Sequence, residues 1–307
     1  MKLFLLGSLA FDEIGQFKGR FRDVIKPEMM DKLTVSFPVE ENQRHFGGCA
    51  GNVAYGLGLL KVPAYLCSRI GEDSGSYERA FREWGMNVDF LDRAQGPTAT
   101  AVVTTDLDGA QITRFSTGVI GEDAPSFQIP GLAAAEDLLL TGPENPKRML
   151  EALEQGHTRG LRVFFDPGQL IHTFKPQELQ GTLEKIAALL VNEYEWALFQ
   201  SISGLSEAEI FQKVPLVWIT KAADGVSLVG GGKIQSFPAF SAEVVDPTGG
   251  GDAFRAGLLA GLAKGLGLEK ATQTGIILAA ACCEHAFAQG YTLKDPQVAA
   301  LRTLGFE

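Results

Sequence analysis

The chain has 307 residues, of which 45% are hydrophobic and 21% charged, and its formal net charge is −10. This composition is that of a folded protein, and the length allows one large α/β unit or two smaller ones. The acidic charge argues against nucleic acid and anionic membranes as partners, because both select basic patches.

The spacing of the cysteines also indicates the cellular compartment of the protein. Cys49, Cys67, Cys282 and Cys283 show no CxxC spacing, so they define neither a zinc site nor a disulfide framework. No apolar stretch reaches the length of a membrane span, and the apolar start of the chain is too short for a signal peptide. We therefore expect a cytoplasmic protein.

The first predicted element is the apolar run Leu3–Leu6, which has the pattern of a buried parallel strand. It ends at Gly7-Ser8, where the carboxyl end of such a strand opens into a loop. We expect that loop to carry Asp12.

Two later segments break the pattern of a buried sheet. Residues 33–39 alternate apolar and polar side chains, which predicts a half-exposed strand. Residues 98–104 and 111–115 alternate in the same way around Asp108-Gly109, which predicts a hairpin. A small β lid is the expected role of these segments. It would comprise residues 11–45 and 96–118.

The rest of the chain alternates apolar runs with amphipathic stretches. Further strands are predicted at 64–68, 137–140, 162–165, 188–191 and 217–219. Helices are predicted after Gly51 and at 76–84, 146–155, 177–184, 207–212, 252–264 and 269–286. This alternation is typical of an α/β fold with a doubly wound, mainly parallel sheet and helices on both faces. That domain would comprise residues 1–10, 46–95 and 119–307.

A glycine-rich segment at residues 45–52 stands at the start of an expected helix. Its glycines let the backbone approach a ligand closely, and Asn52 offers a donor and an acceptor to polyol hydroxyls. The same pattern also fits a helix that packs closely through small residues. The segment alone leaves both interpretations open.

The run Asp246-Pro247-Thr248-Gly249-Gly250-Gly251-Asp252 precedes an apolar helical segment. N–H groups at a helix start lack partners and the helix dipole adds positive charge, so the three glycines would form an anion hole for a transferred phosphoryl group. Asp252 at its mouth could deprotonate or orient a substrate hydroxyl. The alternative is a plain tight turn with Asp252 as helix cap.

Together these segments resemble the signatures of the PfkB, or ribokinase-like, carbohydrate kinase family. A G-G-x-x-x-N pattern occupies residues 47–52, N-x-x-E occupies 192–195, and D-x-T-G-x-G-D occupies 246–252. The resemblance spans nearly the whole chain and is closest to bacterial adenosine kinases of the mycobacterial type. It implies a ribokinase-like fold with a lid, ATP and Mg²⁺ as cofactors, and a homodimer formed through lid strands.

The resemblance also implies roles for individual residues. Asp252 would be the catalytic base, and Gly249, Gly250 and Gly251 the anion hole. The residues implied to bind the substrate are Ser8, Asp12, Ser36, Gly47, Gly48, Asn52, Phe115 and Gln169. The residues implied to lie along the nucleotide are Asn192, Thr220, Gly225, Thr248, Gly249 and Gly251. Glu195 is implied to hold Mg²⁺ through water, and Asp246 to lie near K⁺.

The implied reaction is phosphoryl transfer from ATP to a primary hydroxyl of a nucleoside, adenosine first, giving AMP as in purine salvage. Ala101 stands where such adenosine kinases carry a base-stacking aromatic, whereas Phe115 is retained. One alternative is a ribokinase-like sugar kinase acting on ribose, fructose or a keto-acid sugar. Another is a non-catalytic nucleoside-binding protein. A flat slot lined by Phe115, with Phe37 or Phe174, would favour the nucleoside.

Overall fold

Eight strands form the main sheet within residues 1–26, 31–32, 34–121 and 123–306, the part of the chain that this computed structural model describes. They lie in the order β14-β13-β12-β11-β10-β9-β1-β4; the strands from β12 to β4 are parallel, and β13 and β14 are antiparallel additions. Their bounds are β1 Leu3–Leu6, β4 Tyr65–Leu66, β9 Leu138–Thr141, β10 Arg162–Phe165, β11 Ala188–Asn192, β12 Leu216–Thr220, β13 Val226–Gly230 and β14 Lys233–Phe237.

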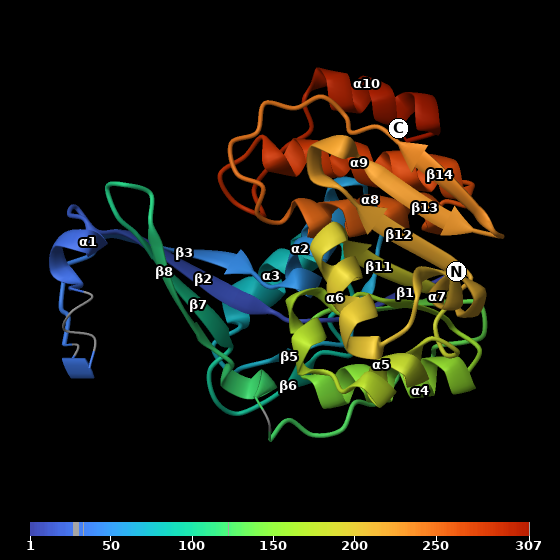
Figure 1. Ribbon diagram of the computed structural model, residues 1–307, viewed down its shortest axis with the longest axis horizontal. Helices are drawn as coiled ribbons and strands as arrows, with labels where there is room; N and C mark the ends of the chain where they lie inside the picture. Colours follow the sequence, from blue (N-terminus) through green and yellow to red (C-terminus); the bar gives the residue numbers. More distant parts are fainter. Residues whose placement is uncertain (27–30, 33, 122, 307) are drawn as a thin grey trace.

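The main sheet separates two hydrophobic cores. Successive side chains of a strand point to opposite faces, so Leu3 and Leu5 of β1 enter one core and Phe4 and Leu6 the other. Helices within residues 49–83 and 250–304 cover the first core, and helices within residues 146–213 cover the second. Figure 1 shows the two helical layers on either side of the sheet. The predicted doubly wound α/β fold is therefore confirmed.

The helices of the body agree with most of the predicted ranges. Their bounds are α2 Cys49–Leu59, α3 Gly75–Glu83, α4 Pro146–Thr158, α5 Pro176–Thr182, α6 Glu193–Ser203, α7 Glu207–Lys213, α8 Gly250–Ala263, α9 Leu268–Cys283 and α10 Asp295–Leu304. The sequence patterns did not predict α6 or α10. The N-x-x-E motif is the signal for α6, because Asn192 and Glu195 form its capping box.

A second, four-stranded sheet extends away from the body at one end of the molecule (Figure 1). Its order is β3-β2-β7-β8, with β2 at Ala10–Gln16, β3 at Glu40–Gly47, β7 at Ala99–Thr105 and β8 at Gln111–Ser116. β2 is parallel to β7 and the other pairs are antiparallel. The predicted hairpin is β7 and β8. Asp12, expected in a loop, lies within β2.

The strand predicted at residues 33–39 was wrong. Residue 33 lies outside the described residues, and 34–39 form no strand. Phe37 instead packs against Phe17 and Phe21, with ring centroids 4.8 and 5.3 Å apart. The polar segment of β3 becomes a strand instead, because it pairs with β2.

The chain also has smaller elements. They include α1 Phe21–Val24, the parallel pair β5 Arg69–Ile70 and β6 Asp92–Arg93, and 3₁₀ turns at Gly118–Ile120, Gly168–Thr173 and Ala222–Asp224. None of the helices in the described ranges has both the length and the apolar character needed to cross a membrane.

Candidate active site

The carboxyl ends of the parallel strands bring several predicted site residues to one edge of the main sheet. Ser8 follows β1 and Asp166 follows β10, while Asn192 and Thr220 end β11 and β12 and are paired directly across the two strands. In open α/β sheets this edge is where ligands bind.

The late glycine run starts α8, as its sequence pattern predicted. Gly249 is the N-cap with φ +79°, and a Cβ there would lie 2.4 Å from the Cβ of Ala288, so both conformation and space require glycine. No side chain among the described residues caps this helix. The N–H of Gly250 donates to the carbonyl of Pro247 over 3.1 Å, so those of Gly251 and Asp252 are left to a ligand or water. Asp252 is the third residue of the helix, so its interpretation as the N-cap is wrong.

Asp252 receives a hydrogen bond from a residue of the early glycine-rich segment. The Nδ2 of Asn52, on α2, donates to its Oδ2 over 2.8 Å. Burial raises the pKa of Asp252 to about 6, although Arg255 and the bond from Asn52 favour the carboxylate. A carboxyl group of this pKa can exchange a proton near neutral pH.

A buried ion pair lies beneath the glycine run. Arg255, one turn beyond Gly251 on α8, donates from Nη1 to the carbonyl of Gly251 over 2.9 Å and from Nη2 to Asp166 over 2.8 Å. Its Nε also contacts Asp166. The sequence patterns did not single out this pair. The available signal was a charged residue within the apolar helix, because a buried arginine needs a carboxylate partner.

The early glycine-rich segment starts α2 opposite α8. Gly48 is its N-cap with φ +82°, and the N–H of Cys49 donates to Ser8 Oγ over 3.1 Å. Close packing through small residues is also present, because a Cβ on Gly56 would lie 2.6 Å from that of Ala256. The close packing through small residues is therefore confirmed, and the role of this segment as a substrate loop stays a prediction.

Asp12 lies over the same segment. A Cβ on Gly47 would lie 2.1 Å from its Oδ2, so the glycine leaves room for the carboxylate. Burial raises the pKa of Asp12. In the second sheet Asp12 pairs with Ala101 of β7, which pairs with Phe115 of β8. Residues directly opposite one another share a face, so Asp12 and Phe115 flank the small Ala101.

Asn192 and Glu195 face each other across the start of α6. Asn192 Oδ1 accepts from the N–H of Glu195, and Glu195 Oε2 accepts from the N–H of Asn192, both over 2.8 Å. Burial, and then Asp166, raise the pKa of Glu195. The described residues include no cluster of three metal-ligating side chains. A single carboxylate beside a phosphate chain nevertheless fits Mg²⁺, which keeps water and takes phosphate oxygens as ligands.

Gly225, predicted along the nucleotide, and Asp246, predicted near K⁺, lie outside the helices and strands. Gly225 has φ +86°, and a Cβ there would lie 2.0 Å from the carbonyl oxygen of Phe237. Asp246 Oδ1 accepts from the N–H of Thr248 over 2.9 Å, which shapes the turn ahead of the glycine run.

Three further predicted residues differ in their exposure. Ser36 is exposed in the segment that forms no strand, and Gln169 is exposed in the turn after β10. Phe174 is 4% exposed in the core beneath α4 and α5, so it lines no open slot. Phe115 is 52% exposed on β8 and is available for a ligand.

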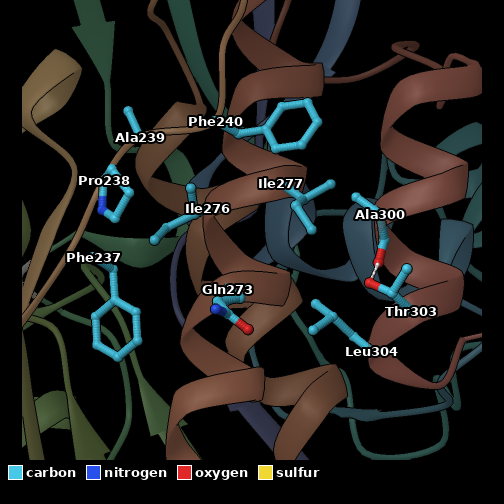
Figure 2. A pocket seen from close by; sticks show the side chains of 10 residues that line it. All are labelled: Phe237, Pro238, Ala239, Phe240, Gln273, Ile276, Ile277, Ala300, Thr303 and Leu304. Atoms are coloured by element: carbon cyan, nitrogen blue, oxygen red, sulfur yellow. Dashed lines mark hydrogen bonds between the residues drawn. The ribbon is translucent and has the colours of Figure 1, made fainter.

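A cavity of about 290 Å³ lies elsewhere, between the chain after β14, the middle of α9 and α10 (Figure 2). It is lined by Phe237, Pro238, Ala239, Phe240, Gln273, Ile276, Ile277, Ala300, Thr303 and Leu304. None of these is a predicted site residue. The cavity is therefore distinct from the cluster around Asp252.

Comparison with known proteins shows that most of the chain matches one protein family. Residues 21–294 match the pfkB family carbohydrate kinase. A nucleoside kinase of Methanocaldococcus jannaschii is 28% identical over 80% of this chain and 82% of its own. A fructokinase of Klebsiella pneumoniae is 31% identical over 71% of this chain and 76% of its own.

Solved structures of a Burkholderia thailandensis nucleoside kinase are similar over nearly the full length. The ligand-free form has a TM-score of 0.84 and 33% identity, covering 97% of this chain and 99% of its own. A complex described as ADP-inosine has a TM-score of 0.78 and 31% identity, covering 99% and 96%.

Proposed function

Because this chain belongs to the PfkB family of carbohydrate kinases and is a phosphotransferase with an alcohol acceptor, we propose that it is a nucleoside kinase. It transfers the γ-phosphoryl group of ATP to a primary hydroxyl of the nucleoside. Adenosine, converted to AMP, is the first candidate. The relatives that act on nucleosides and the neighbour complexed with ADP and inosine support this acceptor and ATP as donor.

The observation that carries the proposal is the hydrogen bond between Asn52 and Asp252. It joins the starts of α2 and α8, so the proposed substrate loop and the proposed anion hole meet at one carboxylate. A hydroxyl held by Asp12 and Asn52 would lie beside Asp252 and the unpaired N–H groups at the start of α8. This is the arrangement that in-line phosphoryl transfer requires.

Asp252 acts in this proposal as the general base. It accepts the proton of the substrate hydroxyl as the oxygen attacks the γ-phosphorus, and the N–H groups of the glycine run stabilise the negative charge of the transferred group. The helix dipole of α8 adds to that stabilisation. No lysine is needed at the phosphate.

The nucleotide lies along the edge formed by Asn192, Thr220, Gly225 and Thr248. Glu195, already oriented by its cap to Asn192, would hold Mg²⁺ through water, and the ion would neutralise phosphate charge when bound. Asp246 is proposed to lie near K⁺. Assays with Mg²⁺ removed by chelation, and with K⁺ replaced by a bulky organic cation, test the two ions separately.

The acceptor is recognised by the second sheet. Asp12 accepts from ribose hydroxyls, and Phe115 stacks on the base above the small Ala101. We assign residues 11–45 and 96–118 to a lid that closes over the body, formed by 1–10, 46–95 and 119–307, and excludes water. The fructokinase at 31% identity favours a second candidate, a sugar kinase, in which Phe115 has no role.

The edges of the lid support a homodimer. β8 is an edge strand whose six residues are all exposed, and such edges can pair with a second chain. Sedimentation of the wild type and of Ile112→Lys tests this, since a charged side chain on the edge would weaken the pairing.

The acceptor is tested by a coupled kinase assay with ATP over a panel of nucleosides, pentoses and hexoses. We expect the highest kcat/KM with a nucleoside. Preference for ribose or fructose would support the sugar kinase, and no turnover with any of them would support a binding protein.

A further inference from the structure

A chain of buried hydrogen bonds ends on Asp252. Tyr77 on α3 donates from its hydroxyl to the carbonyl of Gly47 over 2.8 Å. Gln289, which follows α9, donates from Nε2 to the Tyr77 oxygen over 2.8 Å and to Asn52 Oδ1 over 2.9 Å. Asn52 then donates from Nδ2 to Asp252 over 2.8 Å. Three side chains from separate elements thus connect a backbone carbonyl to the proposed base.

The carbonyl of Gly47, the acceptor at the start of this series of hydrogen bonds, determines the direction of every bond in the series. The carbonyl of Gly47 cannot donate, so the Tyr77 proton points to it and the Tyr77 oxygen is left to accept. Gln289 must therefore present its Nε2 and not its Oε1. The same Nε2 meets the Oδ1 of Asn52, so the Nδ2 of Asn52 faces Asp252.

Little water reaches these groups. Tyr77 is 0%, Asn52 8% and Gln289 9% exposed, so a reversed amide would place two acceptors together without solvent to compensate. The backbone also leaves room for the contact between Tyr77 and Gln289. A Cβ on Gly51 would lie 1.8 Å from the Tyr77 hydroxyl, so glycine is required there for the tyrosine to reach Gln289.

We propose that Tyr77 and Gln289 are positioning residues for phosphoryl transfer, which hold the Asn52 amide in the one orientation that donates to Asp252. This inference rests on the proposed role of Asp252 as base. The bound N–H keeps the carboxylate ionised and fixes one of its oxygens, so that the other is left for the substrate hydroxyl.

Other charged and titratable groups also face Asp252. They are Cys49 on α2, Tyr77 on α3, Asp166 after β10, Glu195 on α6, Arg255 on α8, Cys282 on α9 and Tyr291 after it. Burial, then Asp166 and Glu195, raise the pKa of Asp252, and Arg255 and Asn52 oppose that rise. Among the described residues, Asn52 is the side chain that hydrogen-bonds this carboxylate. Reorientation of the Asn52 amide would therefore raise the pKa of Asp252 further.

The test compares the pH dependence of kcat/KM, the turnover at low nucleoside concentration, in the full-length wild type, Gln289→Met and Tyr77→Phe. In Gln289→Met, loss of the hydrogen bond from Asn52 to the Asp252 carboxylate is expected to shift the acid limb, the fall in activity at low pH, up by about one pH unit. Turnover would then fall about fivefold at the wild-type midpoint and recover at alkaline pH. Tyr77→Phe, which keeps the ring, should move the limb in the same direction by less.

Two matched variants separate this role from a general loss of packing. Tyr55→Phe removes a hydroxyl that donates to the carbonyl of Tyr291 over 2.6 Å, outside the chain to Asp252. Gln297→Met removes a 2% exposed amide that donates to Glu284 over 3.2 Å. Both are expected to leave the midpoint of the acid limb unchanged, even where they lower the melting temperature.

A second readout does not depend on turnover. Titration of the Asp252 carboxyl by ¹³C NMR should give a higher midpoint in Tyr77→Phe and Gln289→Met than in the wild type. An active wild type whose acid limb and carboxyl titration are both unmoved by these variants would overturn the inference. A wild type that phosphorylates no nucleoside would contradict the proposed function, and the NMR titration would still decide the orientation of Asn52.

Discussion

Arg255 and Asp166, 89 residues apart in the sequence, form a buried ion pair directly beneath the glycine run, with Arg255 Nη2 donating over 2.8 Å. The pair connects α8 to the end of β10, and its arginine also holds the carbonyl of Gly251. The anion hole is therefore supported from below by one guanidinium.

Removal of the Arg255 guanidinium should lower the free energy of unfolding substantially. In Arg255→Met the carboxylate of Asp166 is left buried without a partner, and the free energy of unfolding should fall by about 3–5 kcal/mol. Urea denaturation followed by circular dichroism measures it. The double variant Asp166→Asn, Arg255→Met should recover part of the loss, because the unpaired charge is gone.

Arg22→Met is the control for this experiment. Arg22 pairs with Asp108 at the surface and its side chain is 71% exposed, so its loss should cost less than about 1 kcal/mol. Equal losses in Arg22→Met and Arg255→Met would argue against a structural role for the buried pair.

The pH dependence of turnover follows from Asp252. Its pKa of about 6 means that the carboxylate, the form that can accept a proton, predominates only above that pH. We expect kcat/KM, which reports the free enzyme, to fall as pH drops through about 6 and to level off above it. Stopped assays in overlapping buffers measure this. A kcat/KM that stays level well below pH 6 would mean that another group sets the rate.

Gly249→Ala should impair phosphoryl transfer. A non-glycine residue at φ +79° is strained by about 1–2 kcal/mol, and the new Cβ would meet the backbone of Ala288 at 2.8 Å, so the N–H groups of the helix start must move. Displacing one such donor typically costs about 10²–10³ in kcat. Steady-state kinetics measure the loss.

Gly181→Ala is the matched control. Gly181 lies in α5, and apart from its chain neighbours and the backbone of its own helix no described atom lies within 4 Å of an added Cβ. Alanine there should raise stability by about 0.5–1 kcal/mol and leave kcat unchanged. A similar loss of kcat in the two variants would contradict the proposed role of the glycine run.

Phe115→Ala should separate a nucleoside from a sugar as acceptor. If the ring stacks on a base, its loss removes about 0.5–1.5 kcal/mol, and the KM for the nucleoside rises by up to about tenfold. Ile112→Ala is the control, because Ile112 lies on the opposite face of β8. Unchanged KM in Phe115→Ala would place the base elsewhere.

The main sheet and the late motif were predictable because their signals are local. The apolar run of β1 and the glycines before α8 each specify a conformation within a few residues. β3 was not predictable in this way, because its polar sequence becomes a strand only by pairing with β2. Asp12 was misplaced in a loop for the same reason.

The supporting residues of the site depend on contacts between distant parts of the chain. Gln289 hydrogen-bonds Tyr77 and Asn52, which lie 212 and 237 residues away in the sequence. No local sequence pattern predicts such contacts. Arg255 is an intermediate case. A charge within an apolar helix predicts that a partner exists, but only the fold identifies the partner as Asp166.

The most direct test of the account is the turnover of Asp252→Asn with the nucleoside that the wild type prefers. Asparagine keeps the shape and can still accept from Asn52, so the KM should stay within a few-fold of wild type while kcat falls by about 10²–10⁴. A kcat close to that of the wild type would contradict the assignment of Asp252 as the base.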